Sequence, residues 1–163
     1  MTQQPWIQHF SRTDIRDGLH YDHGKNKTVL IQIKDATDPP FVIPCRKDDY
    51  VTIYQFMFDD IDDWTQDECI QQNQADSLVQ ILRSAYDNRH NVLVHCHAGI
   101  CRSSAVAIIG EKIGFQLEHR SRLPNKLVMQ RMFLSLGMED ESEKIKNGYL
   151  SAYRPDDWWE GDI

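Results

Sequence analysis

The sequence predicts a single α/β domain, in which helices flank a central, mostly parallel sheet of four or five strands. Short runs of β-branched and aromatic residues alternate with segments of helical periodicity. One of the runs, residues 91–95, is apolar enough to be buried on both faces, as in the middle of a parallel sheet. The 163 residues contain no repeat, linker or low-complexity segment, so one domain is expected over residues 1–163.

The first part of the chain is expected to supply three strands, of which the first lies at an edge of the sheet. Ser11 or Thr13 is a suitable N-cap for a short helical segment over residues 12–19. Residues 35–49 contain three prolines and many charged side chains, and are therefore predicted to form a surface loop. The expected strand ranges are residues 6–10, 28–33 and 50–58.

The second part of the chain is expected to be mainly helical around the buried strand. Thr65 and Glu68 fit a capping box, and an apolar stripe follows, so a helix is predicted from Thr65 to about Asn88. Residues 103–113 are nearly all apolar, which predicts a buried helix that ends at Gly114. Two further helices are predicted over residues 125–136 and 139–152.

Composition excludes several classes of function. The formal net charge is −7, and the basic residues are scattered, so nucleic acid is not expected as a partner. No apolar run approaches the roughly 18 residues of a membrane span, and the first residues do not resemble a signal peptide. The four cysteines show neither a disulfide framework nor paired zinc spacing. A cytoplasmic monomer with reduced thiols and no membrane partner is expected.

The loop between the buried strand and the buried helix has the residues for anion chemistry. This signature loop, residues 95–103, reads His-Cys-His-Ala-Gly-Ile-Cys-Arg-Ser. Its backbone N–H groups and the N-terminus of the next helix can surround an anion. Gly99 permits a close approach of the backbone, and Arg102 can bind two anion oxygens through its planar guanidinium. The same positive field favours the thiolate form of Cys96, which makes it a candidate nucleophile.

The signature loop resembles the motif His-Cys-x-x-Gly-x-x-Arg-Ser/Thr of the cysteine-dependent protein tyrosine phosphatase superfamily, and small dual-specificity-like members are the most similar. The resemblance covers residues 50–136 well, and implies metal-independent hydrolysis of phosphate monoesters without a cofactor. Cys96 would attack phosphorus, Arg102 would hold the phosphoryl oxygens, and Ser103 would help the thiolate to leave. His95 would orient the loop. The phosphate-binding residues would be His97, Ala98, Gly99, Ile100, Cys101 and Arg102.

Two other interpretations of this loop are less consistent with its sequence. Four of the nine residues are Cys or His, which would suit a metal site. However, consecutive side chains at the end of a strand point in opposite directions, so His95, Cys96 and His97 do not readily share one ion. A rhodanese-like sulfur carrier also has a cysteine in an anion-binding loop, but Gly99 and Ser103 at their offsets favour the phosphatase.

The acidic loop, residues 59–63, follows the third predicted strand and contains four aspartates. In dual-specificity-like relatives, an aspartic acid in this place protonates the leaving group and later activates water. Asp60 is the first candidate by its position after the strand. Asp63, which is 33 residues before Cys96 rather than 36, is the main rival, and Asp59 and Asp62 stay open. A solvated acidic loop is the simplest alternative, because the spacing is not that of a calcium loop.

The substrate predicted by the resemblance is a phosphorylated protein. The variable loop positions contain no Lys or Arg, whereas relatives that act on inositol lipids often have basic residues there. Phosphotyrosine, with phosphoserine and phosphothreonine as further candidates, is therefore expected. The alternative is a catalytically inactive module that binds phosphorylated partners. A further hypothesis is that oxidised Cys96 is trapped as a disulfide with Cys101.

Overall fold

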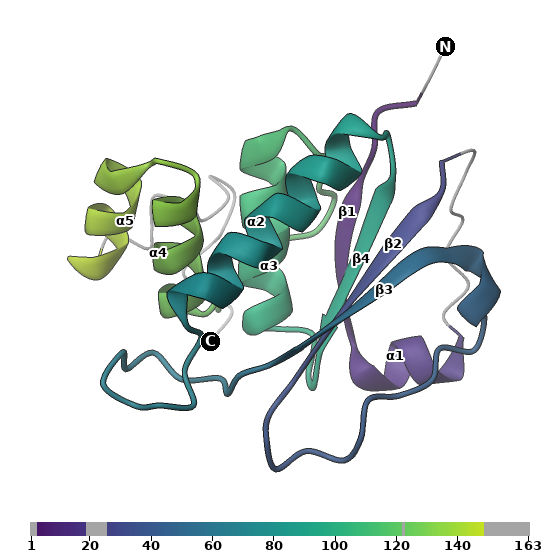
Figure 1. Cartoon of the computed structure of the whole chain (residues 1–163), viewed down its shortest axis with the longest axis horizontal. Helices are drawn as coiled ribbons and strands as arrows, with labels where there is room; N and C mark the ends of the chain where they lie inside the picture. The colour runs from purple at the N-terminus through teal and green to yellow at the C-terminus, as the bar shows by residue number, and fades with distance from the viewer. Residues whose placement is uncertain (1–2, 19–25, 122, 149–163) are drawn as a thin grey trace, which may run out of the picture.

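The computed structural model describes residues 3–18, 26–121 and 123–148, whose core is a four-stranded parallel sheet with the order β1-β4-β2-β3 (Figure 1). This confirms the predicted α/β class. The strands are β1 (Ile7–Ser11), β2 (Thr28–Lys34), β3 (Tyr50–Met57) and β4 (Asn91–Cys96).

The central strand of the sheet is the one that leads into the signature loop. All six residues of β4 are buried, because β1 and β2 pair with its two edges and side chains cover both faces. The predicted edge strand is β1, whose Ile7 is opposite Val92. At the other edge, β3 is paired only with β2, and most of its side chains are exposed or half-buried. Cys96 is therefore the last residue of the most buried strand of the sheet.

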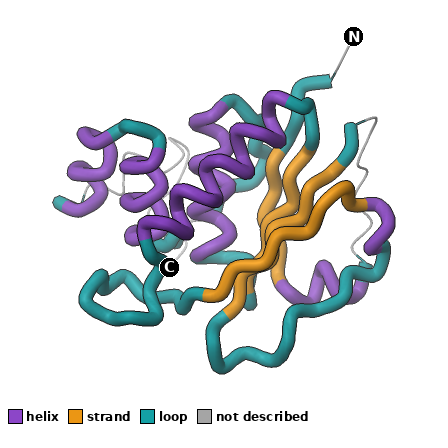
Figure 2. Tube along the Cα trace, viewed as in Figure 1, coloured by secondary structure: helices purple, strands orange, loops and turns teal. Residues whose placement is uncertain are grey.

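Helices cover the sheet unequally. A large core of apolar side chains lies between one face of the sheet and α2, α3 and α4, while a smaller cluster around Trp6, Ile15, Leu30 and Leu93 lies on the other face with α1 (Figures 1 and 2). The helices are α1 (Arg12–Asp17), α2 (Gln72–Asp87), α3 (Arg102–Ile113), α4 (Lys126–Ser135), α5 (Glu139–Lys146) and the short 3-10 helix η1 (Lys47–Asp49).

The predicted start of α2 at Thr65 is wrong. Asp63 accepts hydrogen bonds from the Thr65 backbone N–H at 2.9 Å and from its hydroxyl at 2.7 Å, so the two residues form a turn. The helix begins at Gln72, and the side-chain oxygen of Gln74 accepts the backbone N–H of Gln71 at 2.9 Å. The long segment between β3 and α2 is therefore a loop, which extends the acidic loop toward the helix.

Two other helix predictions agree closely with the structure. Ser11 is the N-cap of α1, and Gly114 is the C-cap of α3. The last helix, α5, is shorter than the predicted range 139–152, of which residues 149–152 lie outside the described residues. No described helix has the length and apolar character to cross a membrane.

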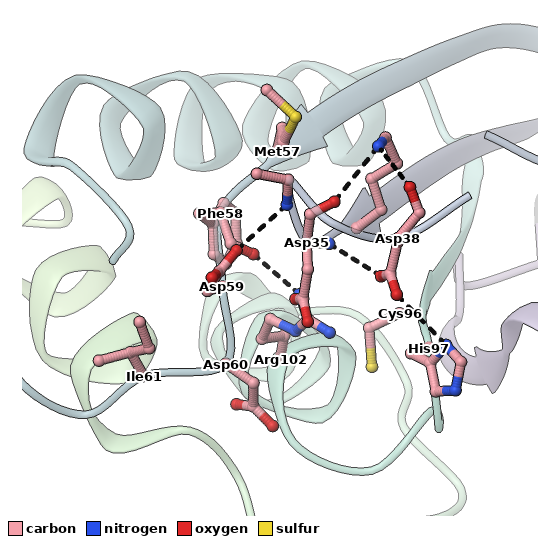
Figure 3. A network of polar contacts seen from close by, with 12 residues as sticks. Asp35, Asp38, Met57, Phe58, Asp59, Asp60, Ile61, Cys96, His97 and Arg102 are labelled. Atoms are coloured by element: carbon pink, nitrogen blue, oxygen red, sulfur yellow. Dashed lines mark hydrogen bonds and ion pairs between the residues drawn. The ribbon is translucent and has the colours of Figure 1, made fainter. Parts of the chain in front are cut away.

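The parallel sheet fixes where the loops meet. Because all four strands run in the same direction, the loops that follow β2, β3 and β4 all begin at the carboxyl end of the sheet. These are the proline-rich loop after Lys34, the acidic loop after Met57 and the signature loop after β4. Figure 3 shows that side chains from all three loops approach one another. The candidate functional site therefore lies at this end of the sheet.

Candidate active site

The candidate nucleophile lies at the carboxyl end of the central strand. Cys96 is 2% exposed, and its Sγ is 3.2 Å from the Oγ of Ser103 in the first turn of α3. The strand β4 fixes the first residue of this pair, and the buried helix α3 fixes the second. A hydroxyl at this distance can donate a hydrogen bond to a sulfur anion. The two residues therefore have the mutual geometry that a thiolate and its stabilising donor require.

The signature loop is held from both sides by backbone contacts. On one side, the N–H of Arg12 donates to the carbonyl of His97 at 3.1 Å. On the other, the N–H of Asn125, the N-cap of α4, donates to the carbonyl of Cys101 at 3.0 Å. Gly99 has φ of 72°, and a Cβ added there would lie 2.4 Å from the carbonyl carbon of Phe10. This position therefore needs glycine for its conformation and for the close approach of β1.

Arg102, the first residue of α3, extends beneath the loops that follow β2 and β3 (Figure 3). Its side chain is 4% exposed. Nη1 donates to the carboxylate of Asp35 and, at 2.8 Å, to the carbonyl of Phe58. Nε is buried and has no hydrogen-bond partner among the described residues. A buried guanidinium with an unsatisfied N–H group is suited to bind an anion.

Sequence reasoning missed Asp35, which it assigned only to a surface loop. The side chain of Asp35 is 31% exposed and pairs with Arg102 across two loops. Burial raises the pKa of Asp35 above its usual range, an effect that Arg102 opposes and that Asp38 and Asp59 reinforce. The separation of 67 residues between the partners left no local signal in the sequence. The sequence signal that could have identified Asp35 is its position directly after a parallel strand, at the carboxyl end of the sheet where the signature loop also lies.

A second contact links the loop after β2 to the signature loop. Nδ1 of His97 is 3.7 Å from Oδ1 of Asp38, and the two side chains are drawn together in Figure 3. Asp38 also accepts the backbone N–H of Asp35 at 2.9 Å. The ammonium of Lys34 donates to the backbone carbonyls of both aspartates, at 3.2 and 3.4 Å. The segment from Lys34 to Asp38 is therefore a compact turn beside the candidate site.

The structure separates the four aspartates of the acidic loop. Asp60 accepts a hydrogen bond at 2.8 Å from the side-chain amide of Asn125, the residue that also binds the signature loop. Asp59 accepts the backbone N–H of Ala36 at 3.2 Å. The carboxylate of Asp63 accepts hydrogen bonds from the backbone N–H and the hydroxyl of Thr65 in the same turn, and these bonds hold the pKa of Asp63 below the usual range. Asp60 is thus the member of the set that shares a partner with the signature loop, whereas Asp62 is exposed.

Two other titratable residues of the signature loop have shifted pKa values. Burial lowers the pKa of His95 to about 4, so the imidazole is neutral behind the loop. Burial and the nearby Asp60 carboxylate raise the pKa of Cys101 to about 11. A thiol reacts with oxidised sulfur as the thiolate, so this shift disfavours disulfide formation between Cys96 and Cys101 at neutral pH.

The remaining residues predicted to bind phosphate form the rim of the loop. Ala98 is exposed and the side chain of Ile100 is 45% exposed, whereas Gly99 is buried against β1. Within the described part of the chain, no three His, Cys, Asp or Glu residues are arranged to hold a metal ion. The four cysteines are free thiols.

Among the comparisons with known proteins, only solved structures match this chain. No protein-family model and no curated protein sequence match the chain. Among solved structures, the human tyrosine phosphatase-like serine/threonine/tyrosine-interacting protein matches with a TM-score of 0.53 and 16% identity, over 88% of this chain and 93% of that one. The tyrosine phosphatase OH1 of the Orf virus matches with a TM-score of 0.47 and 16% identity, over 93% and 72%. The first likeness shows that this chain has the tyrosine phosphatase-like fold, as its signature loop predicts.

Proposed function

We propose that this protein is a cysteine-dependent protein phosphatase that hydrolyses phosphotyrosine monoesters, with phosphoserine and phosphothreonine as further candidate substrates. The observation that carries the proposal is the arrangement of Cys96, Arg102 and Ser103 where β4 meets α3. The sulfur has a hydroxyl at 3.2 Å, and the buried Nε of the neighbouring guanidinium has no partner among the described residues. A phosphate dianion satisfies that donor and brings phosphorus to the sulfur.

The proposed reaction has two steps. In the first, the thiolate of Cys96 forms a bond to phosphorus, the phosphorus–oxygen ester bond breaks, and Asp60 gives its proton to the leaving oxygen. In the second, Asp60 accepts a proton from water as the water oxygen attacks phosphorus, and the sulfur–phosphorus bond breaks. Ser103 donates a hydrogen bond to the sulfur anion that leaves. Arg102 and the backbone N–H groups of the signature loop stabilise the charge on the phosphoryl oxygens.

Asp60 is the acid that we propose, for two reasons. Its hydrogen bond to Asn125 holds it beside the signature loop. Its rival Asp63 accepts hydrogen bonds from Thr65 that lower its pKa, so that it holds a proton only at lower pH. A general acid must be protonated at the pH of the reaction. Asp63 is therefore the weaker candidate, although its spacing from Cys96 is closer to that of the relatives.

The charges at the rim support a protein substrate with one phosphate rather than a polyanionic ligand. Arg102 is the one Lys or Arg of the signature loop, and its Nη1 is bound to Asp35. Asp38 and Asp59 lie close to Asp35. These carboxylates repel additional phosphate groups, while the exposed side chain of Ile100 offers apolar contact for an aromatic ring or a peptide. We further propose that the protein acts as a monomer, without cofactor, nucleic acid or membrane, in the reducing cytoplasm.

The test is hydrolysis of a small aryl phosphate between about pH 4 and pH 9 in the presence of EDTA. We expect the parent to be active under these conditions and Cys96→Ser to be inactive. Asp60→Asn should lose the decrease in rate at high pH that reports the general acid, whereas Asp63→Asn should keep it. Loss of the parent activity in EDTA contradicts the metal-independent mechanism. An active Cys96→Ser variant contradicts the phosphocysteine intermediate.

The second candidate function is a module that binds phosphorylated partners without hydrolysing them. One observation favours it, namely that the carboxylate of Asp35 already interacts with Arg102 and thereby reduces the charge available to a transition state. The human protein with the same fold is named phosphatase-like and interacting. In this case the parent binds inorganic sulfate but has no activity at any pH, and Asp60→Asn changes neither property.

A further inference from the structure

The imidazole of His9 lies between two backbone carbonyl oxygens. His9 is in β1, and its Nδ1 is 2.7 Å from the carbonyl oxygen of Gly99 in the signature loop. Its Nε2 is 3.1 Å from the carbonyl oxygen of His119, in the connection between α3 and α4. Neither carbonyl can donate a hydrogen bond, so both ring nitrogens must be donors for both contacts to form. A neutral imidazole has one N–H group, whereas the imidazolium ion has two.

The loop on one side of this imidazole also contacts β1 and the first residue of α1. Gly99 is pressed against β1, because an added Cβ would be 2.4 Å from the carbonyl carbon of Phe10. Two residues earlier, His97 accepts the N–H of Arg12 at 3.1 Å. The carbonyl of Gly99 points toward His9, which orients the peptide group between Gly99 and Ile100. The N–H of that peptide is among the loop donors available to an anion.

The segment on the other side is attached to the free edge of β1. The N–H of Ile7 donates to the carbonyl of Gln116 at 2.9 Å, and the N–H of Gln116 donates to the carbonyl of Pro5 at 3.0 Å. His9 continues this attachment two residues further along β1. The ring therefore joins three segments that are distant in the sequence, namely β1, the signature loop and the connection.

Several charged groups lie on the segments that contact this ring, and three of the cationic or titratable basic side chains have a carboxylate partner. Arg120 pairs with Glu111, Arg102 pairs with Asp35, and His97 is near Asp38. These carboxylates reduce the repulsion that their three partners exert on a positive charge on His9. The titratable or charged residues on the contacting segments are Glu118, His119 and Arg120 of the connection, His97, Cys101 and Arg102 of the signature loop, Glu111 and Lys112 of α3, His95 and Cys96 of β4 and Arg12 after β1.

We propose that His9 is a positioning residue, which as the imidazolium ion bridges Gly99 and His119 and thereby holds the signature loop in its anion-binding conformation. Deprotonation removes one of the two bonds and loosens the loop. Because both carbonyl contacts require a ring N–H, the bridge couples anion affinity to the protonation state of His9. This proposal rests on the proposed phosphate site, because it concerns the loop that binds the anion.

The first measurement detects the bridge itself and does not depend on anion binding. In NMR spectra of the parent at about pH 5.5, both ring N–H protons of His9 should be visible and exchange slowly with water, since both are hydrogen-bonded. His90 lies at the opposite end of β4 and is the matched control, whose ring protons should exchange rapidly. Rapid exchange of either ring proton of His9 overturns the bridge.

The second measurement tests the consequence, with inorganic sulfate as the probe, because sulfate stays a dianion throughout the pH range of the measurement. At about pH 5.5, His9→Gln should bind sulfate about tenfold more weakly than the parent, and at about pH 8.5 the two should differ by less than about threefold. His119→Ala keeps the backbone acceptor and should resemble the parent. His97→Gln shows how much of the pH dependence belongs to the loop's own histidine.

The outcomes separate this proposal from the proposed function. A parent that binds no sulfate at either pH contradicts the phosphate site, and the ring protons still decide whether the bridge exists. The parent could bind sulfate and show slow exchange of the His9 ring protons, while His9→Gln binds sulfate as tightly as the parent at both pH values. That combination would show that the bridge exists but does not position the loop. A folded His9→Gln variant, checked by its circular dichroism, is required for each comparison.

Discussion

A single carboxylate has two opposite effects on the key cation of the candidate site. Asp35 orients Arg102 by binding Nη1, together with the carbonyl of Phe58. At the same time its negative charge opposes the approach of an anion to the same guanidinium. If the protein is the proposed phosphatase, orientation of Arg102 helps catalysis, whereas the charge of Asp35 weakens anion binding. The two effects should therefore be separable by a substitution that keeps the shape of the side chain and removes its charge.

We expect Asp35→Asn to lower kcat about tenfold and to bind sulfate several-fold more tightly than the parent. The amide still accepts a hydrogen bond but no longer holds Arg102 through an ionic bond, so the guanidinium is less well oriented. Steady-state kinetics with an aryl phosphate and sulfate titration measure the two quantities. Asp38→Asn is the matched control, because Asp38 is close to His97 rather than Arg102. Weaker sulfate binding by Asp35→Asn would contradict the electrostatic part of this account.

The sequence was sufficient to predict the residues that share one loop, but not the partners that reach it from elsewhere. Cys96, Arg102 and Ser103 are recognisable because their spacing is fixed within the signature loop. Asp35 and His9 contact that loop only after the sheet has formed. Nothing in their local sequences differs from an ordinary surface loop or an edge strand. Their roles depend on tertiary contacts that single-sequence patterns do not encode.

At the scale of elements, β1 contacts the signature loop and α3 in different ways. The backbone of β1 at Phe10 touches Gly99 directly, with an added Cβ at 2.4 Å and φ of 72°. On α3, Gly110 also faces β1, but an added Cβ would meet the Cδ1 atom of Ile7 at 2.6 Å. The first neighbour is backbone and cannot move, whereas the second is the end of a flexible side chain.

This contrast predicts different results for two chemically identical substitutions. Gly99→Ala should destabilise the protein by about 2 kcal/mol or more and abolish sulfate binding, because the strand and the loop must separate. Gly110→Ala should change stability by no more than about 1 kcal/mol, since the higher helix propensity of alanine offsets the displacement of Ile7. Urea denaturation and sulfate titration of both variants provide the measurement. Equal effects would mean that the contact with β1 does not constrain the loop.

The elements themselves were predictable where local chemistry decides the boundary. The four strands begin and end within one or two residues of their expected limits, because apolar and β-branched runs are compact. The start of α2 was not predictable in this way. Thr65 has the residue pattern of a capping box, but Asp63 uses its carboxylate to close a turn there, and the glutamines Gln71 and Gln74 form the actual start. The residue pattern alone does not show whether the helix is capped at Thr65 or at Gln71.

At the scale of the whole molecule, burial of His95 links stability to pH. The folded protein has a pKa of about 4 for His95, against an ordinary value near 6.5, so the unfolded chain binds more protons between these values. The stabilising contribution of neutral, buried His95 to the free energy of unfolding is therefore fully present above about pH 6.5 and is lost as the pH falls to about 4. The shift corresponds to about 3 kcal/mol.

The parent should accordingly lose stability between pH 7 and pH 4.5 in urea denaturation, and His95→Asn should lose about 2 to 3 kcal/mol less over the same interval. His90→Asn, a substitution at the half-buried residue directly before β4, should behave as the parent does. If the parent and His95→Asn lose stability equally, other groups are responsible for the acid sensitivity.

The order of the strands in the sheet also affects how the protein is made. β1 is synthesised first, yet its partner β4 follows only after β2, β3 and α2, and Asn125 comes after α3. The signature loop is attached to both the earliest and a late segment, through Arg12 and Asn125. A nascent chain therefore carries Cys96 in an open peptide, without the donors that would activate it. The proposed phosphate site around this cysteine therefore exists only when the fold is complete, so under the proposed function an unfinished or unfolded copy would neither hydrolyse nor trap phosphorylated proteins.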